Sequence, residues 1–145
     1  MTKKNTQFKS SLLKIFILTM VISICSCTKK ISFLNSSLVP AARGYVEINS
    51  DKNKNNVIEI HLTDLAEVQR LEPPRRTYVV WIVTNQNMIK NLGQIKSSSG
   101  MMSKQLKASF RTVTSFKPTR VFITAEDDAN TQYAGKQIVL STKNF

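Results

Sequence analysis

The sequence predicts an all-β domain, namely a two-sheet antiparallel β-sandwich of the immunoglobulin-like kind with about seven strands. Two segments, residues 77–84 and 120–126, are apolar on both alternating faces, which is typical of central strands covered on both sides. The other strand candidates alternate apolar and polar residues, and no long segment has the 3.6-residue apolar period of a helix. We expect the sandwich to occupy residues 42–145 as one small domain.

A β-hairpin is expected first along the chain. Its strands, residues 42–49 and 57–62, alternate apolar and polar side chains on either side of the loop 51–56, DKNKNN. That loop has the alternating oxygen side chains of a calcium-binding loop, but Asn56 and Leu62 stand where the required Gly and bidentate Glu should be. We therefore expect a turn built on Asn and Asp chemistry.

The central strand, residues 77–84, follows a connection in which Asp64 and Glu67 have the spacing to cap one short helical turn. One face of this strand carries Tyr78, Val80 and Ile82, and the other carries Val79, Trp81 and Val83. Trp81 is expected to be a core residue of a strand that lies between two layers. Its truncation to alanine is expected to cost about 3–5 kcal/mol.

Four more strands are expected after the central one. Residues 88–95 form its hairpin partner, with Gly93 as a candidate β-bulge. Residues 103–112 place Leu106, Ala108 and Phe110 inward and Lys107 and Arg111 outward, and residues 120–126 and 137–141 complete the set.

The N-terminal residues 1–26 have the layout of a secretory signal peptide, with a basic start and an apolar run too short to span a bilayer. The segment ends in Ile24-Cys25-Ser26-Cys27, which resembles a bacterial lipobox. The resemblance implies cleavage before Cys27 and attachment of lipid to this cysteine, the one covalent group expected; no other cofactor is predicted. The alternative is an uncleaved or plainly secreted signal with an unused cysteine. Residues 27–41, the lipidated cysteine and a polar tether, would then precede the domain.

The chain is basic, with 21 Lys and Arg against nine acidic residues, which favours anionic partners. Lys107 and Arg111 share an outward strand face and are the candidate anionic-ligand face, although lysines on strands also protect sheet edges. No metal site is predicted. The weak candidates Glu126, Asp127 and Asp128 are better explained as a solvated turn.

Enzymatic activity is not expected. His61 is the only histidine, and it alternates with Val57 and Glu59 on a strand face, where a packed or surface role is commoner than that of a base. No nucleophile motif supports the alternative of a hydrolase.

Several segments together resemble the C-terminal extracytoplasmic domain of anti-sigma-K-type factors. They are YVVWIV at 78–83, NLGQI at 91–95, VFITAED at 121–127 and QIVLS at 137–141. The likeness covers roughly residues 40–141 and implies the fold and an extracytoplasmic location. No sigma-binding domain or spanning helix precedes this region in the sequence, and no catalytic residues are implied.

The sequence therefore predicts a lipoprotein of the bacterial cell envelope, lipid-anchored outside the cytoplasm, with a non-enzymatic binding or accessory role. Its expected partners are the membrane, through the anchor, and an envelope protein or anionic polymer, whereas nucleic acid is not expected at that location. The alternative is an extracytoplasmic sensor that signals through a separate membrane protein.

Overall fold

The computed structural model describes residues 29–95, 97–98 and 107–145. The predicted signal peptide and Cys27 therefore lie outside the described residues. The elements are β1 (Lys29–Ser32), β2 (Arg43–Ser50), β3 (Asn56–Thr63), the 3-10 helix η2 (Val68–Arg70), β4 (Thr77–Thr84), β5 (Ile89–Ile95), β6 (Ser97–Ser98), β7 (Lys107–Thr114), β8 (Pro118–Glu126) and β9 (Ile138–Ser141). No helix within these ranges is long and apolar enough to cross a bilayer.

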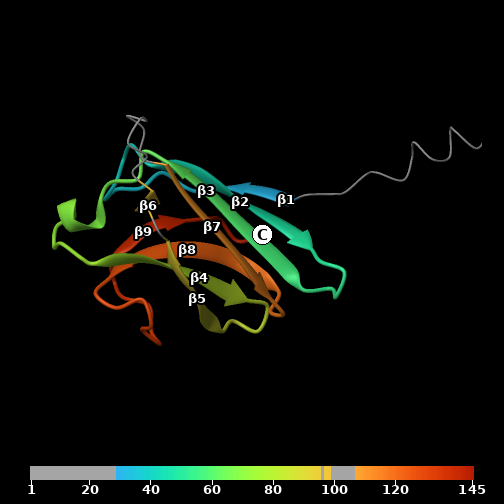
Figure 1. Ribbon diagram of the computed structural model, residues 1–145. Coiled ribbons are helices and arrows are strands. Elements are labelled where there is room, and N and C mark those ends of the chain that lie inside the picture. The colour runs from blue at the N-terminus through green and yellow to red at the C-terminus, as the bar shows by residue number, and fades with distance from the viewer. Residues whose placement is uncertain (1–28, 96, 99–106) are drawn as a thin grey trace, which may run out of the picture.

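The strands form two antiparallel sheets that pack face to face (Figure 1). One sheet has the order β1-β2-β3-β7-β6, and the other has the order β5-β4-β8-β9. Strands β2, β3 and β7 opposite β4, β8 and β9 give the Greek-key arrangement of immunoglobulin-like domains, with β5 paired to β4. The predicted all-β sandwich is thus confirmed. The structure adds β1 and the two-residue β6, which the sequence pattern does not predict.

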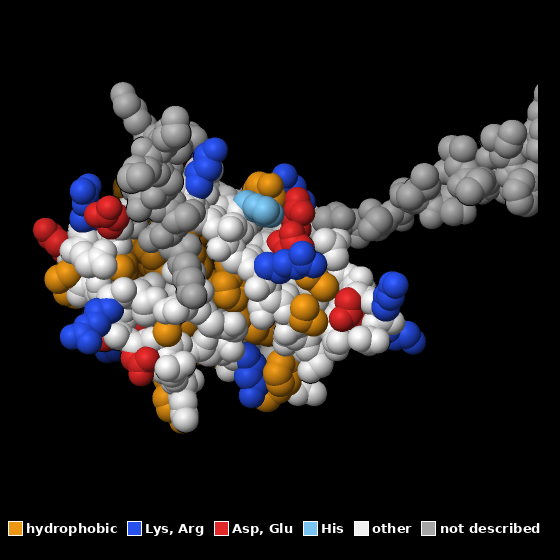
Figure 2. All heavy atoms as spheres, viewed as in Figure 1, with side chains coloured by type: hydrophobic (Ala, Val, Ile, Leu, Met, Phe, Trp, Pro, Cys, Tyr) orange, Lys and Arg blue, Asp and Glu red, His pale blue; other side chains and the backbone are white. Residues whose placement is uncertain are grey.

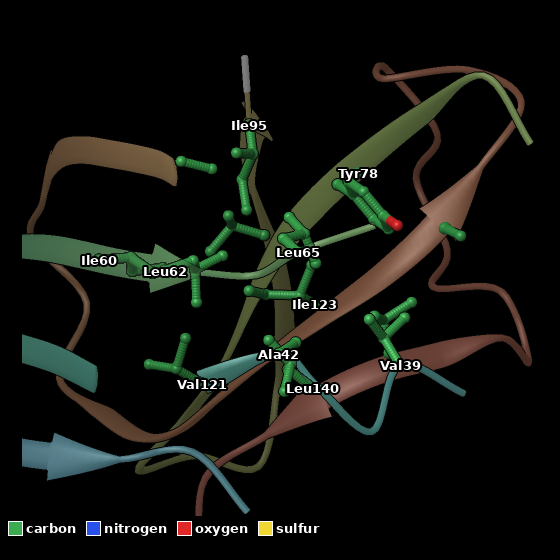
Figure 3. Close-up of a cluster of buried hydrophobic side chains, with 14 of the residues drawn as sticks. Val39, Ala42, Ile60, Leu62, Leu65, Tyr78, Ile95, Val121, Ile123 and Leu140 are labelled. Atoms are coloured by element: carbon green, nitrogen blue, oxygen red, sulfur yellow. The ribbon is translucent and has the colours of Figure 1, made fainter. Parts of the chain in front are cut away.

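The main core lies between the two sheets. Ile58 and Ile60 of β3 and Val80 and Ile82 of β4 are fully buried there, because the alternating pattern of each strand directs these side chains inward. Figure 3 shows side chains from both sheets pointing into this space, together with side chains of the connecting loops.

Trp81 lies in a second, smaller core on the opposite face of β4. It is fully buried with Val79 and Phe122, and Ala134 of the β8–β9 loop packs against this group. The predicted burial of Trp81 and the predicted cover on both faces of β4 are confirmed, and the layer over this second face is a loop and not a sheet. The Trp81 ring stacks on Phe122, with ring centroids 6.3 Å apart and planes 13° apart.

The sequence predicts a tether over residues 27–41, whereas the structure includes residues 29–41 in the fold. Strand β1 pairs along its whole length with β2, and Val39 is buried in the main core. Phe33 forms an isolated bridge with Thr142, and the Leu34 amide donates to the Ser141 carbonyl at 2.9 Å. This segment therefore joins β1 at the edge of one sheet to β9 at the edge of the other.

The predicted turn between β2 and β3 is confirmed. The Asp51 carboxylate accepts hydrogen bonds from the backbone amides of Asn53 and Asn55, both at 2.8 Å. The Asn55 backbone amide, assisted by its side chain, holds the pKa of Asp51 below its ordinary value of 3.8. Lys54 completes the turn with a left-handed backbone at φ 63°.

The predicted bulge in β5 is also confirmed. Val80 pairs with Gly93 and Trp81 pairs with Asn91, so Leu92 is the extra residue, and Gly93 has a φ of 123° that favours glycine.

The capping prediction for Asp64 and Glu67 is wrong. The short helix begins at Val68, and the Glu67 side chain makes no capping hydrogen bond. Asp64 instead adopts a left-handed turn at φ 56°.

Candidate functional site

The outward side of the five-stranded sheet gathers titratable and aromatic side chains in three cross-strand rungs, which we call the outer face. The first rung is Arg43–Thr63–Lys107, the second is Tyr45–His61–Ser109, and the third is Glu47–Glu59–Arg111, each read across β2, β3 and β7. Figure 2 shows acidic and basic side chains around the pale blue histidine on this face. The antiparallel register of three strands therefore assembles residues that are far apart in the chain.

The third rung neutralises part of the positive charge predicted for this face. The Arg111 guanidinium Nε lies 3.2 Å from a carboxylate oxygen of Glu59, and 72% of the Arg111 side chain is exposed. Glu47 lies opposite Glu59 on one side and Lys30 of β1 on the other. The outer face is consequently mixed in charge. Its two cations without a described carboxylate partner, Arg43 and Lys107, both lie in the first rung.

The second rung places two rings side by side. The centroids of the Tyr45 and His61 rings are 5.0 Å apart, and the Lys30 ammonium nitrogen lies 3.5 Å from the Tyr45 centroid. Ser109 is the cross-strand neighbour of His61, but no hydrogen bond joins these two described side chains. The arrangement is therefore suited to stacking and cation contacts, and it lacks the hydrogen-bonded nucleophile and base of a hydrolytic site.

One metal-ligand grouping occurs on the same face. One oxygen each of Glu47 and Glu59 and one ring nitrogen of His61 lie within 4.8 Å of one another. The spacing would suit a divalent cation, but the Arg111 cation already contacts Glu59 and would repel a second positive charge. We therefore assign no metal to this grouping.

A hollow opens beside the first and second rungs. Its volume is about 540 Å³, and its polar lining comes from Arg43, Tyr45, His61, Thr63, Lys107 and Ser109. The Arg43 guanidinium donates to the backbone oxygens of Pro40 and Ala42 at 2.5 and 2.8 Å, which fixes it at one side. Lys107 supplies the remaining cation of the lining.

Gly44 lets β2 approach β3 at the floor of the hollow. A Cβ atom at this position would collide with the backbone oxygen of His61 and with the Leu62 side chain. The close approach of β2 to β3 at this point therefore depends on a residue without a side chain.

The structure places the predicted anionic-ligand pair on one face but in different surroundings. Lys107 and Arg111 both point outward from β7, with the exposed Ser109 between them. Lys107 borders the hollow, whereas Arg111 is held by Glu59. Of the strand predicted over residues 103–112, the first four residues lie outside the described part of the chain.

The weak metal candidates at the end of β8 are occupied by structural contacts. The Glu126 carboxylate accepts from the Thr124 hydroxyl at 2.5 Å and from the Gly135 amide at 2.7 Å. Asp127 forms an ion pair with Arg75. These contacts fasten the β8–β9 loop, as expected for a structural turn.

Asp128 caps the same loop by accepting from the Asn130 amide at 2.9 Å. None of the three carboxylates belongs to the metal-ligand grouping found among the described residues.

Sequence reasoning missed the contributions of Tyr45, Glu47 and His61 to a common face. The signal was available, because an in-register hairpin between the two predicted first strands places Tyr45 opposite His61. The pairing of β3 with β7 was not predictable in the same way, because it joins segments that are far apart in the sequence.

Comparison with known proteins adds no relative: no family model, curated protein or solved structure matches the chain.

Proposed function

We propose that the protein is a lipoprotein of the bacterial cell envelope, anchored outside the cytoplasm by lipid on Cys27, with a non-enzymatic binding role. The proposal is supported by the signal-like residues 1–26 and by the lipobox resemblance that ends at Cys27. It agrees with the position of β1, which starts two residues after that cysteine.

The observation that carries the binding role is the hollow on the outer face. It brings together the Lys107 cation, the Tyr45 ring and the His61 ring at an open surface. Cations bind carboxylates and phosphates, and aromatic rings pack against the apolar faces of sugars. The ligand is accordingly an anionic envelope polymer or an acidic segment of an envelope protein, bound along the first and second rungs.

A retention experiment tests this ligand class. The detergent-solubilised full chain would be applied to immobilised polygalacturonate, a polycarboxylated sugar chain. The wild type should be retained at low salt and elute as salt rises, because exposed charge pairs are screened. The double variant Lys107→Glu with Arg111→Glu should lose retention.

A matched control is available on the β3–β4 connection and the β8–β9 loop. Arg70, like Arg111, is an exposed arginine paired with a glutamate, and Lys136 is an exposed lysine. The double variant Arg70→Glu with Lys136→Glu changes net charge by the same amount and should keep retention. An equal loss of retention in both double variants would mean that net charge alone determines binding. It would overturn the assignment of the binding site to the outer face.

The regulatory alternative predicts a different partner. Crosslinking in intact envelopes should then recover a membrane-spanning regulator with the wild-type chain. Recovery of such a protein, without any retention on polymer, would favour the sensor over the polymer-binding role.

A further inference from the structure

One end of the sandwich collects the start of β1 and three hairpin loops, and we call it the anchor end. Strand β1 enters here at Lys29, and the loops are residues 51–55, 85–88 and 115–117, at the right of Figure 1. Hydrogen bonds connect these segments: the Asn56 side chain donates to the Phe116 carbonyl, and the Asn85 amide donates to the Lys117 carbonyl, both at 3.0 Å. The loops therefore form one continuous surface.

The anchor end is strongly basic. It carries six lysines and one acidic side chain, Asp51, whose carboxylate is occupied by the turn that it stabilises. None of these lysines forms an ion pair with a carboxylate in the described part of the chain. The lysines are Lys29, Lys52, Lys54, Lys90, Lys117 and Lys143.

Among the described residues, the opposite end of the sandwich has no such excess of charge. Six of the nine acidic residues of the chain lie there, on the β3–β4 connection and at the end of β8 with its following loop. Six basic residues described at that end balance them, and two form the ion pairs Arg70–Glu67 and Arg75–Asp127. The net positive charge of residues 29–95, 97–98 and 107–145 is thus concentrated at the end where β1 enters.

Apolar side chains project from the same surface. Ile89, Val113 and Phe116 are 50%, 54% and 40% exposed, and they lie at the anchor-end limits of β5 and β7 and in the β7–β8 loop. The Lys90 ammonium nitrogen lies 5.3 Å from the Phe116 ring centroid. Exposed apolar groups among lysines are the composition of surfaces that bind the headgroup region of membranes.

We propose that the anchor end rests on the anionic headgroups of the membrane that holds the lipid on Cys27. This inference rests on the proposed lipid anchor, and it adds a fixed orientation to it. The two residues from Cys27 to Lys29 span at most about 7 Å, so the lysines start within reach of the headgroup phosphates. The opposite end then points away from the bilayer.

A fluorophore attached at one end or the other of the sandwich, in the full lipidated chain, reports this orientation. Cys25 and Cys27 are the only cysteines, and the anchor proposal removes the first with the signal and acylates the second. A cysteine introduced by Asn53→Cys in the β2–β3 loop would therefore be labelled alone. Asn130→Cys in the β8–β9 loop gives the matched control, since both positions are exposed turn residues.

The labelled chains would be reconstituted into phosphatidylcholine vesicles that contain a headgroup-linked quencher, with or without phosphatidylglycerol. We expect severalfold stronger quenching at position 53 than at position 130 in the anionic vesicles, and a loss of this difference in neutral vesicles or at high salt. The variant Lys52→Glu with Lys117→Glu should also abolish the difference, whereas Arg70→Glu with Lys136→Glu should preserve it.

Two failures are distinguishable. Equal quenching at both positions in chains that float with the vesicles overturns the docking orientation and leaves the anchor standing. Failure of the wild-type chain to incorporate labelled palmitate at Cys27 in cells overturns the anchor itself, and the inference built on it falls as well.

Discussion

Truncation of Trp81 tests how the second core contributes to stability. Its side chain is fully buried, and its indole N–H donates to the Thr124 hydroxyl at 2.8 Å. Trp81→Ala removes this bond and opens a large cavity against Phe122, so we expect a loss of about 3–5 kcal/mol in the free energy of unfolding. Such a loss is a large share of the roughly 5–15 kcal/mol that stabilises a small domain.

A second variant separates packing from hydrogen bonding at this position. Trp81→Phe keeps an aromatic ring over Phe122 but removes the donor to Thr124, so its expected cost is smaller, about 1–3 kcal/mol. If burial of the ring contributes more than the hydrogen bond, Trp81→Ala should lower the free energy of unfolding more than Trp81→Phe does.

The measurement is urea unfolding followed by circular dichroism, because both variants lack the only tryptophan. The midpoint should fall while the slope with urea stays constant, as for a change in stability alone. Val113→Ala is the matched control, since that side chain is 54% exposed and should change stability little. A Trp81→Ala midpoint equal to that of the control would refute the role of Trp81 as a core residue.

Three further perturbations follow from the described contacts. Gly44→Ala should cost about 1–3 kcal/mol in urea unfolding, because its methyl group would overlap the backbone of His61; an unchanged midpoint would contradict this. Thr124→Val should cost about 1–3 kcal/mol by leaving the Trp81 indole without an acceptor, and stability equal to wild type would speak against the bond. Burial raises the pKa of Tyr78 from 10.0 to about 12, so the unfolded chain releases the phenol proton at a lower pH than the folded chain does. The free energy of unfolding should therefore fall as pH rises from about 10 to about 12. Tyr78→Phe should flatten that decline.

Much of the fold was predictable because the pattern of each main strand is local. Apolar and polar residues alternate in β2 and β3, and both faces of β4 and β8 are apolar. Each of these patterns indicates a strand from its own residues alone. Strand β1 was not predictable in this way, since three of its four residues are Lys or Ser, which is common at sheet edges. The cover over Trp81 was predicted, but the β8–β9 loop was not identified as its source, because this loop presents only a small residue, Ala134, to the ring.

The candidate site was predictable only in part. The outward direction of Lys107 and Arg111 follows from alternation alone, and it is confirmed. The ion pair between Arg111 and Glu59 depends on the register of β3 with β7, which joins segments about fifty residues apart and carries no local signal. The lipid on Cys27 and the anti-sigma-K resemblance stay predictions, because neither is tested by the described residues.

The bridge between Phe33 and Thr142 has a consequence for the timing of folding. It joins the residue that follows the first strand to the residue that follows the last one, so this contact between the two sheets forms only after β9 has been synthesised. Until then the inner faces of both sheets stay accessible to water and to chaperones.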